Sequence, residues 1–251
     1  MTPAPKIAVL CVAALVATTA SAHAGYPVAP DVVVFCEPTL RHTVVDLGAL
    51  WHSETGISVR VFTSPTPAIL EQIAHRGRSD LVIGEGDAAA AAAIERQLVV
   101  PATLRRLWAN RLVVAGMSPT SNLTALAGKA PVAIVDPWAA LAGADGEKAL
   151  QTLGLWNAVR ANSIGVVDTA DASFLLATGK VQLAVLYMTD VAANPAFAIT
   201  DSLPPASDAP IAYWAAETYH AMSPNVAKFA AFLHSSEADE RAKADGLTVL
   251  P

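Results

Sequence analysis

The chain has few cysteines and little positive charge for its length. Two cysteines, Cys11 and Cys36, occur among 251 residues. The 16 lysines and arginines are fewer than the 22 aspartates and glutamates. The formal net charge of -6 argues against nucleic acid as a partner, because neutralising phosphates requires a basic surface. Hydrophobic residues make up 53% of the chain, which is enough to bury large cores and excludes a disordered protein.

One long apolar run is present, at the N-terminus, and no second one follows. A lysine precedes the run "IAVLCVAALVA", and "SAHA" ends it with small residues at Ala22 and Ala24. This layout predicts a secretory signal peptide at residues 1–24 and export to the periplasm. A membrane anchor is the alternative, but the run falls short of the ~20 residues that a span needs. Cleavage would remove Cys11, so Cys36 is expected to form no intramolecular disulfide.

Strand and helix patterns alternate along the rest of the chain. In residues 31–51, "DVVVFCEPTLRHTVVDLGALW", a β-branched run precedes apolar residues spaced four, three and four apart, as on one helix face. Pro38 separates the two patterns, and we expect Thr39 to cap the helix. Three such units run through residues 31–98, and a second series begins at residues 132–136, "VAIVD". Consecutive units of this kind predict parallel sheets with right-handed crossovers.

The pattern predicts an α/β fold with two Rossmann-like lobes joined by a hinge. Residues 109–117, "ANRLVVAGM", read as one strand that crosses between the lobes. We expect residues 25–115 and 201–251 to form lobe 1 and residues 116–200 to form lobe 2. This architecture resembles the type II periplasmic solute-binding proteins, which close on a ligand about a hinge.

Four motifs, "NRLVV", "DPWAALAG", "TLGLW" and "LYMTD", occur in this order along the mature chain. Their order and spacing are similar to those of the molybdate-binding component of ABC importers, and the resemblance covers nearly the whole mature chain. It implies a monomeric receptor that captures a small oxyanion, such as molybdate or tungstate, between two lobes. It also implies an inner-membrane ABC permease as the partner, with no cofactor and no catalysis.

The resemblance further implies a set of ligand-binding residues. The family holds its oxyanion without charge compensation, through two side-chain hydroxyls, two backbone N–H groups and a tyrosine hydroxyl. By ungapped spacing these groups fall on Thr39, on Thr66 with Ser64 as the fallback, on Ala142, on Thr169 and on Tyr187. The three threonines each lie between an expected strand end and helix start, where N–H groups bind anions. A plain helix cap is the alternative for each threonine, and core packing for Tyr187.

Several positions depart from the family pattern. Both expected serines are threonines, Leu141 replaces a proline and Asp145 replaces a tyrosine. Glu37 stands where the family has a small residue, and a carboxylate beside an oxyanion weakens binding through like-charge repulsion. Arg41, one helical turn further along, could neutralise it. If Glu37 instead faces the cleft, it becomes a ligand-binding candidate, and a neutral, cationic or metal-complex ligand becomes the alternative.

Motifs of enzymes and cofactor sites are missing. The chain has no Gly-x-Ser-x-Gly elbow, and its histidines lack metal-ligand spacing such as H-E-x-x-H. Residues 84–89, "GEGDAA", match a dinucleotide fingerprint only weakly, and the tight turn alone explains their glycines. We therefore expect no catalytic residue and no metal ligand. A periplasmic enzyme on the same fold is the remaining alternative.

Overall fold

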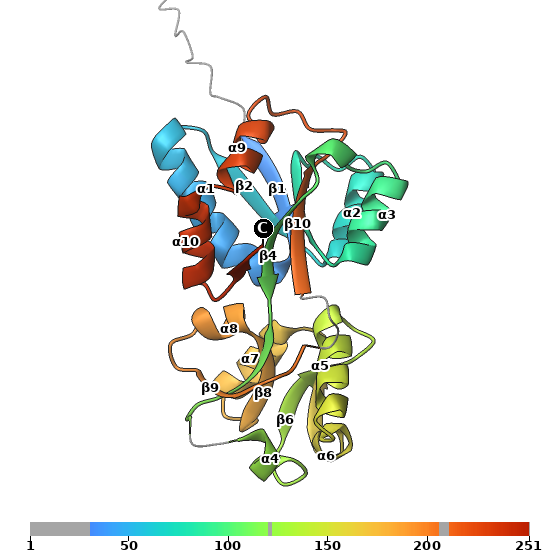
Figure 1. Cartoon of the computed structure of the whole chain (residues 1–251), viewed down its shortest axis with the longest axis vertical. Coiled ribbons are helices and arrows are strands. Elements are labelled where there is room, and N and C mark those ends of the chain that lie inside the picture. Colours follow the sequence, from blue (N-terminus) through green and yellow to red (C-terminus); the bar gives the residue numbers. More distant parts are fainter. Residues whose placement is uncertain (1–30, 120–121, 206–210, 251) are drawn as a thin grey trace, which may run out of the picture.

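Two mixed β-sheets, each with helices on both faces, form the protein (Figure 1). The structure is a computed structural model that describes residues 31–119, 122–205 and 211–250. The first sheet contains β1 (Val32–Cys36), β2 (Val59–Thr63), β3 (Leu81–Glu85), β4 (Arg105–Asn110), β10 (Ile211–Glu217) and β11 (Thr248–Val249). The second contains β5 (Leu112–Gly116), β6 (Val132–Val135), β7 (Ser163–Val166), β8 (Leu183–Tyr187) and β9 (Ala198–Ser202).

Ten α-helices and two short 3-10 turns are described around these sheets. They are α1 (Arg41–Thr55), α2 (Thr66–Ala74), α3 (Asp87–Glu95), α4 (Leu123–Leu126), α5 (Leu141–Thr152), α6 (Trp156–Arg160), α7 (Thr169–Ala177), α8 (Met188–Ala192), α9 (Val226–Phe232) and α10 (Ser236–Ala244), with η1 (Pro38–Leu40) and η2 (Pro101–Thr103). None of the described helices is long and apolar enough to cross a membrane.

The strand order confirms the predicted α/β class. The first sheet runs β11-β4-β10-β3-β1-β2, and β1 pairs parallel with both β2 and β3. The second runs β7-β6-β8-β5-β9, with β6 parallel to β7 and β8. The remaining pairings are antiparallel: β10 pairs with β3 and β4, β11 with β4, and β5 with β8 and β9. The parallel part of each sheet thus comes from its strand-helix units.

The strand predicted at residues 109–117 is two strands. β4 ends at Asn110 in the first sheet and β5 begins at Leu112 in the second, so only Arg111 links them. β4 extends back to Arg105 because it pairs with β10 and β11, two strands that lie more than a hundred residues away.

Sheet membership therefore moves the lobe boundaries. The boundaries expected after residues 115 and 200 fall inside β5 and β9, which pair with each other in the second sheet. We define lobe 1 as the described residues 31–110 and 211–250, and lobe 2 as residues 112–202. Within the described residues the chain passes from lobe 1 to lobe 2 at Arg111 and is again in lobe 1 from Ile211 onward. The signal peptide predicted at residues 1–24 lies outside the described residues.

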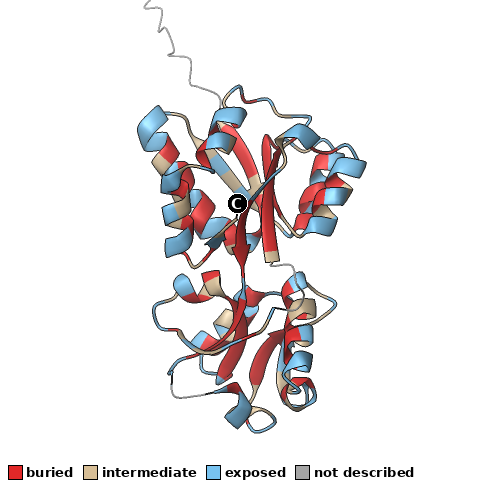
Figure 2. Ribbon diagram, viewed as in Figure 1, coloured by how far each residue is buried: buried red, intermediate tan, exposed pale blue. Residues whose placement is uncertain are grey.

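Alternating side chains of the strands build a core on each face of the first sheet. Val32, Val34 and Cys36 of β1 pack with α1, α9 and α10, whereas Phe35 packs with α2 and α3 on the opposite face. The expected stripe on α1 is confirmed, since Val44, Leu47 and Trp51 are buried, as is Leu40 before it. The central strands form the buried interior, and the helices turn exposed faces outward (Figure 2).

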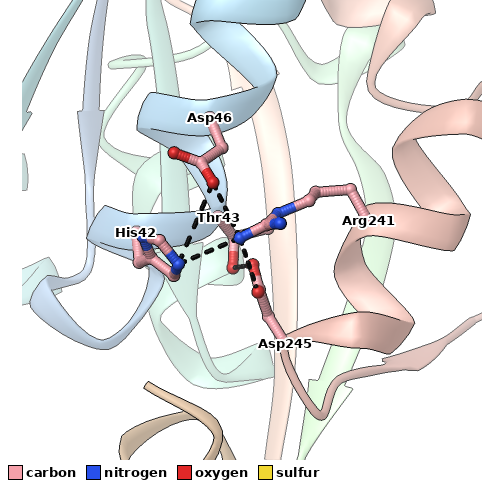
Figure 3. A network of polar contacts seen from close by, with 5 residues as sticks. All are labelled: His42, Thr43, Asp46, Arg241 and Asp245. Atoms are coloured by element: carbon pink, nitrogen blue, oxygen red, sulfur yellow. Dashed lines mark hydrogen bonds and ion pairs between the residues drawn. The ribbon is translucent and has the colours of Figure 1, made fainter. Parts of the chain in front are cut away.

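A charged cluster fastens the C-terminal helix to α1 (Figure 3). Arg241 on α10 places Nη2 2.7 Å from Oδ2 of Asp46 and 2.9 Å from Oδ1 of Asp245. The hydroxyl of Thr43 donates to Oδ2 of Asp245 at 2.7 Å, and His42 completes the cluster at 2.9 Å from Arg241. Residues 41–46 and 241–245 are thereby joined, which holds the end of the chain on lobe 1.

Cys36 is a free cysteine inside the lobe 1 core. Burial and the nearby carboxylate of Glu37 raise the pKa of its thiol to about 12. A thiol that stays protonated at neutral pH is a poor nucleophile, which favours a packing role for this side chain.

Helix α5 contains two glycines with different surroundings. A Cβ atom added to Gly143 would lie 2.2 Å from the carbonyl oxygen of Asp136, which is backbone and cannot give way. A Cβ atom on Gly146 would meet nothing closer than 3.7 Å. The first turn of α5 therefore approaches the end of β6 so closely that only glycine fits at position 143.

We expect Gly143→Ala to lower the free energy of unfolding by about 1–3 kcal/mol, because the helix must move off the chain that follows β6. Gly146→Ala in the same helix is the matched control and should be neutral or stabilising by up to about 1 kcal/mol. Urea unfolding followed by circular dichroism measures both. Equal stability of the two variants would contradict this account of the α5 contact.

Candidate functional site

Polar residues gather where the two lobes meet, at the carboxyl ends of the parallel strands. Glu37 follows β1, Thr66 follows β2, and Glu85 ends β3 in lobe 1, whereas Tyr187 ends β8 in lobe 2. The hydroxyl of Tyr187 donates a hydrogen bond to Oε1 of Glu85 at 2.8 Å, which connects the lobes directly. The carboxyl ends of parallel strands are the usual ligand site of open α/β sheets.

Thr66 occupies the centre of the lobe 1 side. Its backbone N–H donates to Oε1 of Glu37 at 2.5 Å, and its hydroxyl donates to the same oxygen. The hydroxyl oxygen also accepts the backbone N–H of Glu85 at 2.9 Å. Glu37 and Thr66 are both buried. Thr66 thus ties together the loops after β1, β2 and β3, and it is not the N-cap of α2, which is Pro65.

Thr39 faces the same junction but does not cap α1. It lies inside η1, and the N-cap position of α1 is Leu40, so the predicted cap is wrong. Its hydroxyl oxygen lies 3.0 Å from the hydroxyl oxygen of Tyr213 on β10, which also accepts from Nδ2 of Asn110 at 3.2 Å. Asn110 in turn donates to the hydroxyl of Thr189 in lobe 2 at 3.0 Å. A second hydrogen-bonded path therefore crosses between the lobes.

The other predicted residues lie nearby but contribute differently. Thr169 is buried at the start of α7, where Asp168 is the N-cap, and it hydrogen-bonds Asp190. Asp190 accepts the backbone N–H of Tyr187 at 3.0 Å, which ties Thr169 to the lobe junction. Ser64 is half-buried and donates its backbone N–H to the carbonyl of Cys36 at 3.2 Å. The network thus runs through Thr66 and not through Ser64.

Ala142 is buried in the first turn of α5, beside the turn that follows β3. The neighbouring Leu141 lies 3.8 Å from the position that a Cβ atom on Gly86 would take. First-turn N–H groups of a helix have no partner within the helix. The start of α5 therefore presents backbone donors on the lobe 2 side of the junction. Ligand binding by Ala142, like that by the other predicted residues, stays a prediction.

The carboxyls at the junction are held away from solvent and close to one another. Burial raises the pKa of Glu37. Burial, and next the charge of Glu37, raise the pKa of Glu85 to about 8, with a smaller contribution from Asp145. Burial and the charge of Glu85 also raise the pKa values of Tyr187 and Tyr213 well above the ordinary range. The junction at neutral pH therefore favours protonated groups.

No ion pair within the described residues joins Arg41 to Glu37, and Arg41 is exposed. The side chains of Arg41 and Glu37 therefore form no direct ion pair, and neutralisation of this carboxylate by Arg41 stays a prediction. The carboxylate of Glu37 instead accepts two hydrogen bonds from Thr66, one from its backbone N–H and one from its hydroxyl. A buried carboxylate whose partners are neutral donors keeps a high cost of ionisation.

A cavity of about 320 Å³ opens between the lobes beside this network. Thr39, Arg41 and His42 line it from lobe 1, and Thr189 and Asp190 line it from lobe 2. The described residues include no group of three or more His, Cys, Asp or Glu side chains placed to hold a metal ion. The junction therefore offers hydroxyls, backbone N–H groups and separate carboxyls to a small ligand.

Five residues of the network, Glu85, Asn110, Thr189, Asp190 and Tyr213, were not among the predicted site residues. Glu85 lies in "GEGDAA", where the turn is explained by packing: Gly84 faces the ring of Trp214 and Gly86 has a φ of +84°. Tyr213 looks like an ordinary strand residue in the sequence. It reaches the site only because antiparallel pairing of β10 with β3 places it opposite Glu85.

Two α/β lobes that face each other across a polar junction define a two-lobed solute-binding architecture. The chain belongs to the family of bacterial extracellular solute-binding proteins, which it matches over residues 32–248. The molybdate-binding protein ModA of Escherichia coli (strain K12) is 24% identical over 228 residues, covering 87% of this chain and 89% of the relative.

Solved structures share the fold at low sequence identity. The periplasmic molybdate-binding protein of Azotobacter vinelandii is 21% identical, with a TM-score of 0.76 over 88% of this chain and 100% of that protein. Iron-bound HitA from Pseudomonas aeruginosa is 15% identical, with a TM-score of 0.61 over 88% of this chain and 86% of that protein. Relatives with one fold thus bind chemically different solutes.

The raised pKa of Glu85 predicts how stability depends on pH. Between its ordinary value of 4.5 and about 8, the folded state binds more protons than the unfolded state, so stability falls as pH rises through this window. One such proton contributes up to about 1.4 kcal/mol per pH unit, or roughly 3–6 °C in melting temperature.

Glu85→Gln should therefore show a shallower fall in melting temperature between about pH 5 and pH 8 than the wild type. Glu95→Gln, an exposed glutamate on α3 outside the site, is the matched control and should follow the wild-type curve. Differential scanning calorimetry across the pH range checks this. Parallel curves for all three proteins would show that Glu85 titrates normally.

Proposed function

We propose that the chain is an exported receptor of an ABC importer that captures a small oxyanion, such as molybdate or tungstate, between its lobes. The observation that carries the proposal is the junction network, in which Thr66 of lobe 1 and Tyr187 of lobe 2 connect through Glu85. Both residues belong to the donor set that the family resemblance implies. Membership of the extracellular solute-binding family supports the receptor role.

The surroundings of the site suit an oxyanion of this size. Helices α2, α5 and α7 begin at the junction, and a helix N-terminus favours negative charge through its free N–H groups and its dipole. Hydroxyls of Thr39, Thr66 and Tyr187 add neutral donors. The ligand would be held by dipoles rather than by a lysine or arginine, so its size and geometry would select it.

The remaining parts of the proposal concern location and partners. The predicted signal peptide supports export to the periplasm, and the family description supports a location outside the cytoplasm. The receptor would deliver its solute to an inner-membrane permease and would carry out no catalysis. We propose that it acts as a monomer, with the two lobes of one chain enclosing the solute.

A cation or metal complex is a second candidate ligand. The observation that favours it is the pair of carboxyls, Glu37 and Glu85, at the junction, where neither has a lysine or arginine ion-pair partner among the described residues. An uncompensated carboxylate attracts positive charge. Iron-bound HitA illustrates a cation on this fold, although at this identity the likeness concerns the fold alone.

A thermal-shift screen decides between ligand classes. At a hundredfold excess over the dissociation constant, the true ligand should add about 2.7 kcal/mol of stability, which raises the melting temperature by roughly 5–10 °C. Molybdate, tungstate, sulfate and phosphate form one arm, and divalent and trivalent metal ions form the other. Shifts restricted to the metal arm would replace the oxyanion proposal with the second candidate.

Tyr187→Phe should weaken oxyanion binding by roughly tenfold to a hundredfold, because it removes a donor that reaches a charged group, worth about 1.5–3 kcal/mol. Tyr219→Phe, at a side chain that is 53% exposed, is the matched control and should bind as the wild type does. Isothermal titration calorimetry with molybdate gives both affinities. Unchanged affinity in Tyr187→Phe would remove this hydroxyl from the site.

A further inference from the structure

The donors proposed for the oxyanion already bind carboxyl groups of the protein. Oε1 of Glu37 accepts both the N–H and the hydroxyl of Thr66, and Oε1 of Glu85 accepts the hydroxyl of Tyr187 at 2.8 Å. A carboxylate oxygen resembles an oxyanion oxygen in charge and in its hydrogen-bonding capacity. The two glutamates therefore occupy donor positions that an oxyanion ligand would need.

The neighbouring groups do not compensate this negative charge. The negative charge of Glu37 acts on Glu85, and so does that of Asp145 on α5. The phenols of Tyr187 and Tyr213 lie within the influence of both glutamates. Within the described residues the arginine and lysine ion pairs all lie elsewhere. Adding a dianion to two ionised carboxylates would place like charges together in a poorly solvated site.

We propose that Glu37 and Glu85 determine the charge selectivity of the site, and that an oxyanion binds together with protons that these two carboxyls take up from the solvent. The inference rests on the proposed oxyanion capture. It follows from hydrogen-bond chemistry, since an ionised carboxylate can only accept, whereas a protonated carboxyl has an O–H to donate. Protonation thus converts each glutamate from a competitor of the oxyanion into a donor for it.

The same two carboxyls predict a different pH dependence for the binding of a cation. A cation would bind the ionised carboxylates and release protons, so its affinity would rise with pH, whereas the affinity of an oxyanion falls with pH. The raised pKa values of both carboxyls move this proton uptake to a higher pH than that of ordinary glutamates, because burial disfavours their ionised forms. The direction of the pH dependence consequently reports the charge of the ligand.

Isothermal titration calorimetry with molybdate between about pH 6 and pH 9.5 tests the inference on the wild-type chain. Each pH is measured in two buffers with different heats of ionisation, so that the difference in observed heat counts the protons taken up. Above about pH 8, where Glu85 is ionised in the free protein, we expect net proton uptake and an affinity that falls by up to about tenfold per pH unit for each proton; at lower pH, where Glu85 already carries its proton, we expect little uptake. Binding without buffer dependence across this range would overturn the inference while leaving oxyanion capture intact.

Two variants identify which carboxyl takes up the protons when molybdate binds. Glu37→Gln and Glu85→Gln keep the acceptor oxygen of each side chain but remove its ionisation, so each should lower the proton count and bind molybdate more tightly at high pH. Glu95→Gln is the matched control with the same charge change outside the site, and it should retain the wild-type proton count. A thermal melt of each variant confirms that it folds.

Three results separate the possible failures. If molybdate, tungstate and sulfate bind neither the wild type nor the Gln variants at any pH, the proposed function and this inference are both overturned. Gln variants that retain the wild-type pH dependence would overturn the inference alone. Affinity for a divalent cation that rises with pH, in the absence of oxyanion binding, would show that the two carboxylates are cation ligands.

Discussion

The hydrogen bond from Tyr187 to Glu85 is the contact on which the arrangement of the candidate site depends. It joins a strand end of lobe 2 to a strand end of lobe 1, and the backbone N–H of Glu85 extends the path to Thr66. Thr66 then fixes the loop that carries Glu37. A single phenol thereby couples the separation of the lobes to the geometry of three loops, because each hydrogen bond in the path is short and at least partly buried.

A buried polar site of this kind balances two opposing requirements. Burial strengthens each hydrogen bond, but it also raises the cost of leaving Glu37 or Glu85 ionised. Each lobe has its own hydrophobic cores on both faces of its sheet, so folding does not require the junction to be favourable. The junction residues are therefore free to be selected for binding chemistry, which is the usual division between a rigid scaffold and its loops.

The sequence alone predicts local features better than long-range ones. The strand-helix units and the buried stripe on α1 are visible because their periods are local. The break at Arg111 is not, since β4 exists only through pairing with β10 and β11, far along the chain. Thr66 and Tyr187 were found through the family resemblance, whereas Tyr213 was missed because only the register of β10 against β3 places it at the site.

The one-residue link between β4 and β5 has a mechanical consequence. A single residue has two soft torsions, so any rotation between the lobes at this crossing is concentrated at Arg111. The backbone N–H of Arg111 donates to the side-chain oxygen of Asn110, and its carbonyl accepts the backbone N–H of Met188. These contacts place the pivot residue directly beside the candidate site. Groups close to a pivot move little, so a rotation at Arg111 would displace Asn110 and Thr189, which are joined by a 3.0 Å hydrogen bond, less than α4 and α6 at the end of lobe 2 away from lobe 1 (Figure 1).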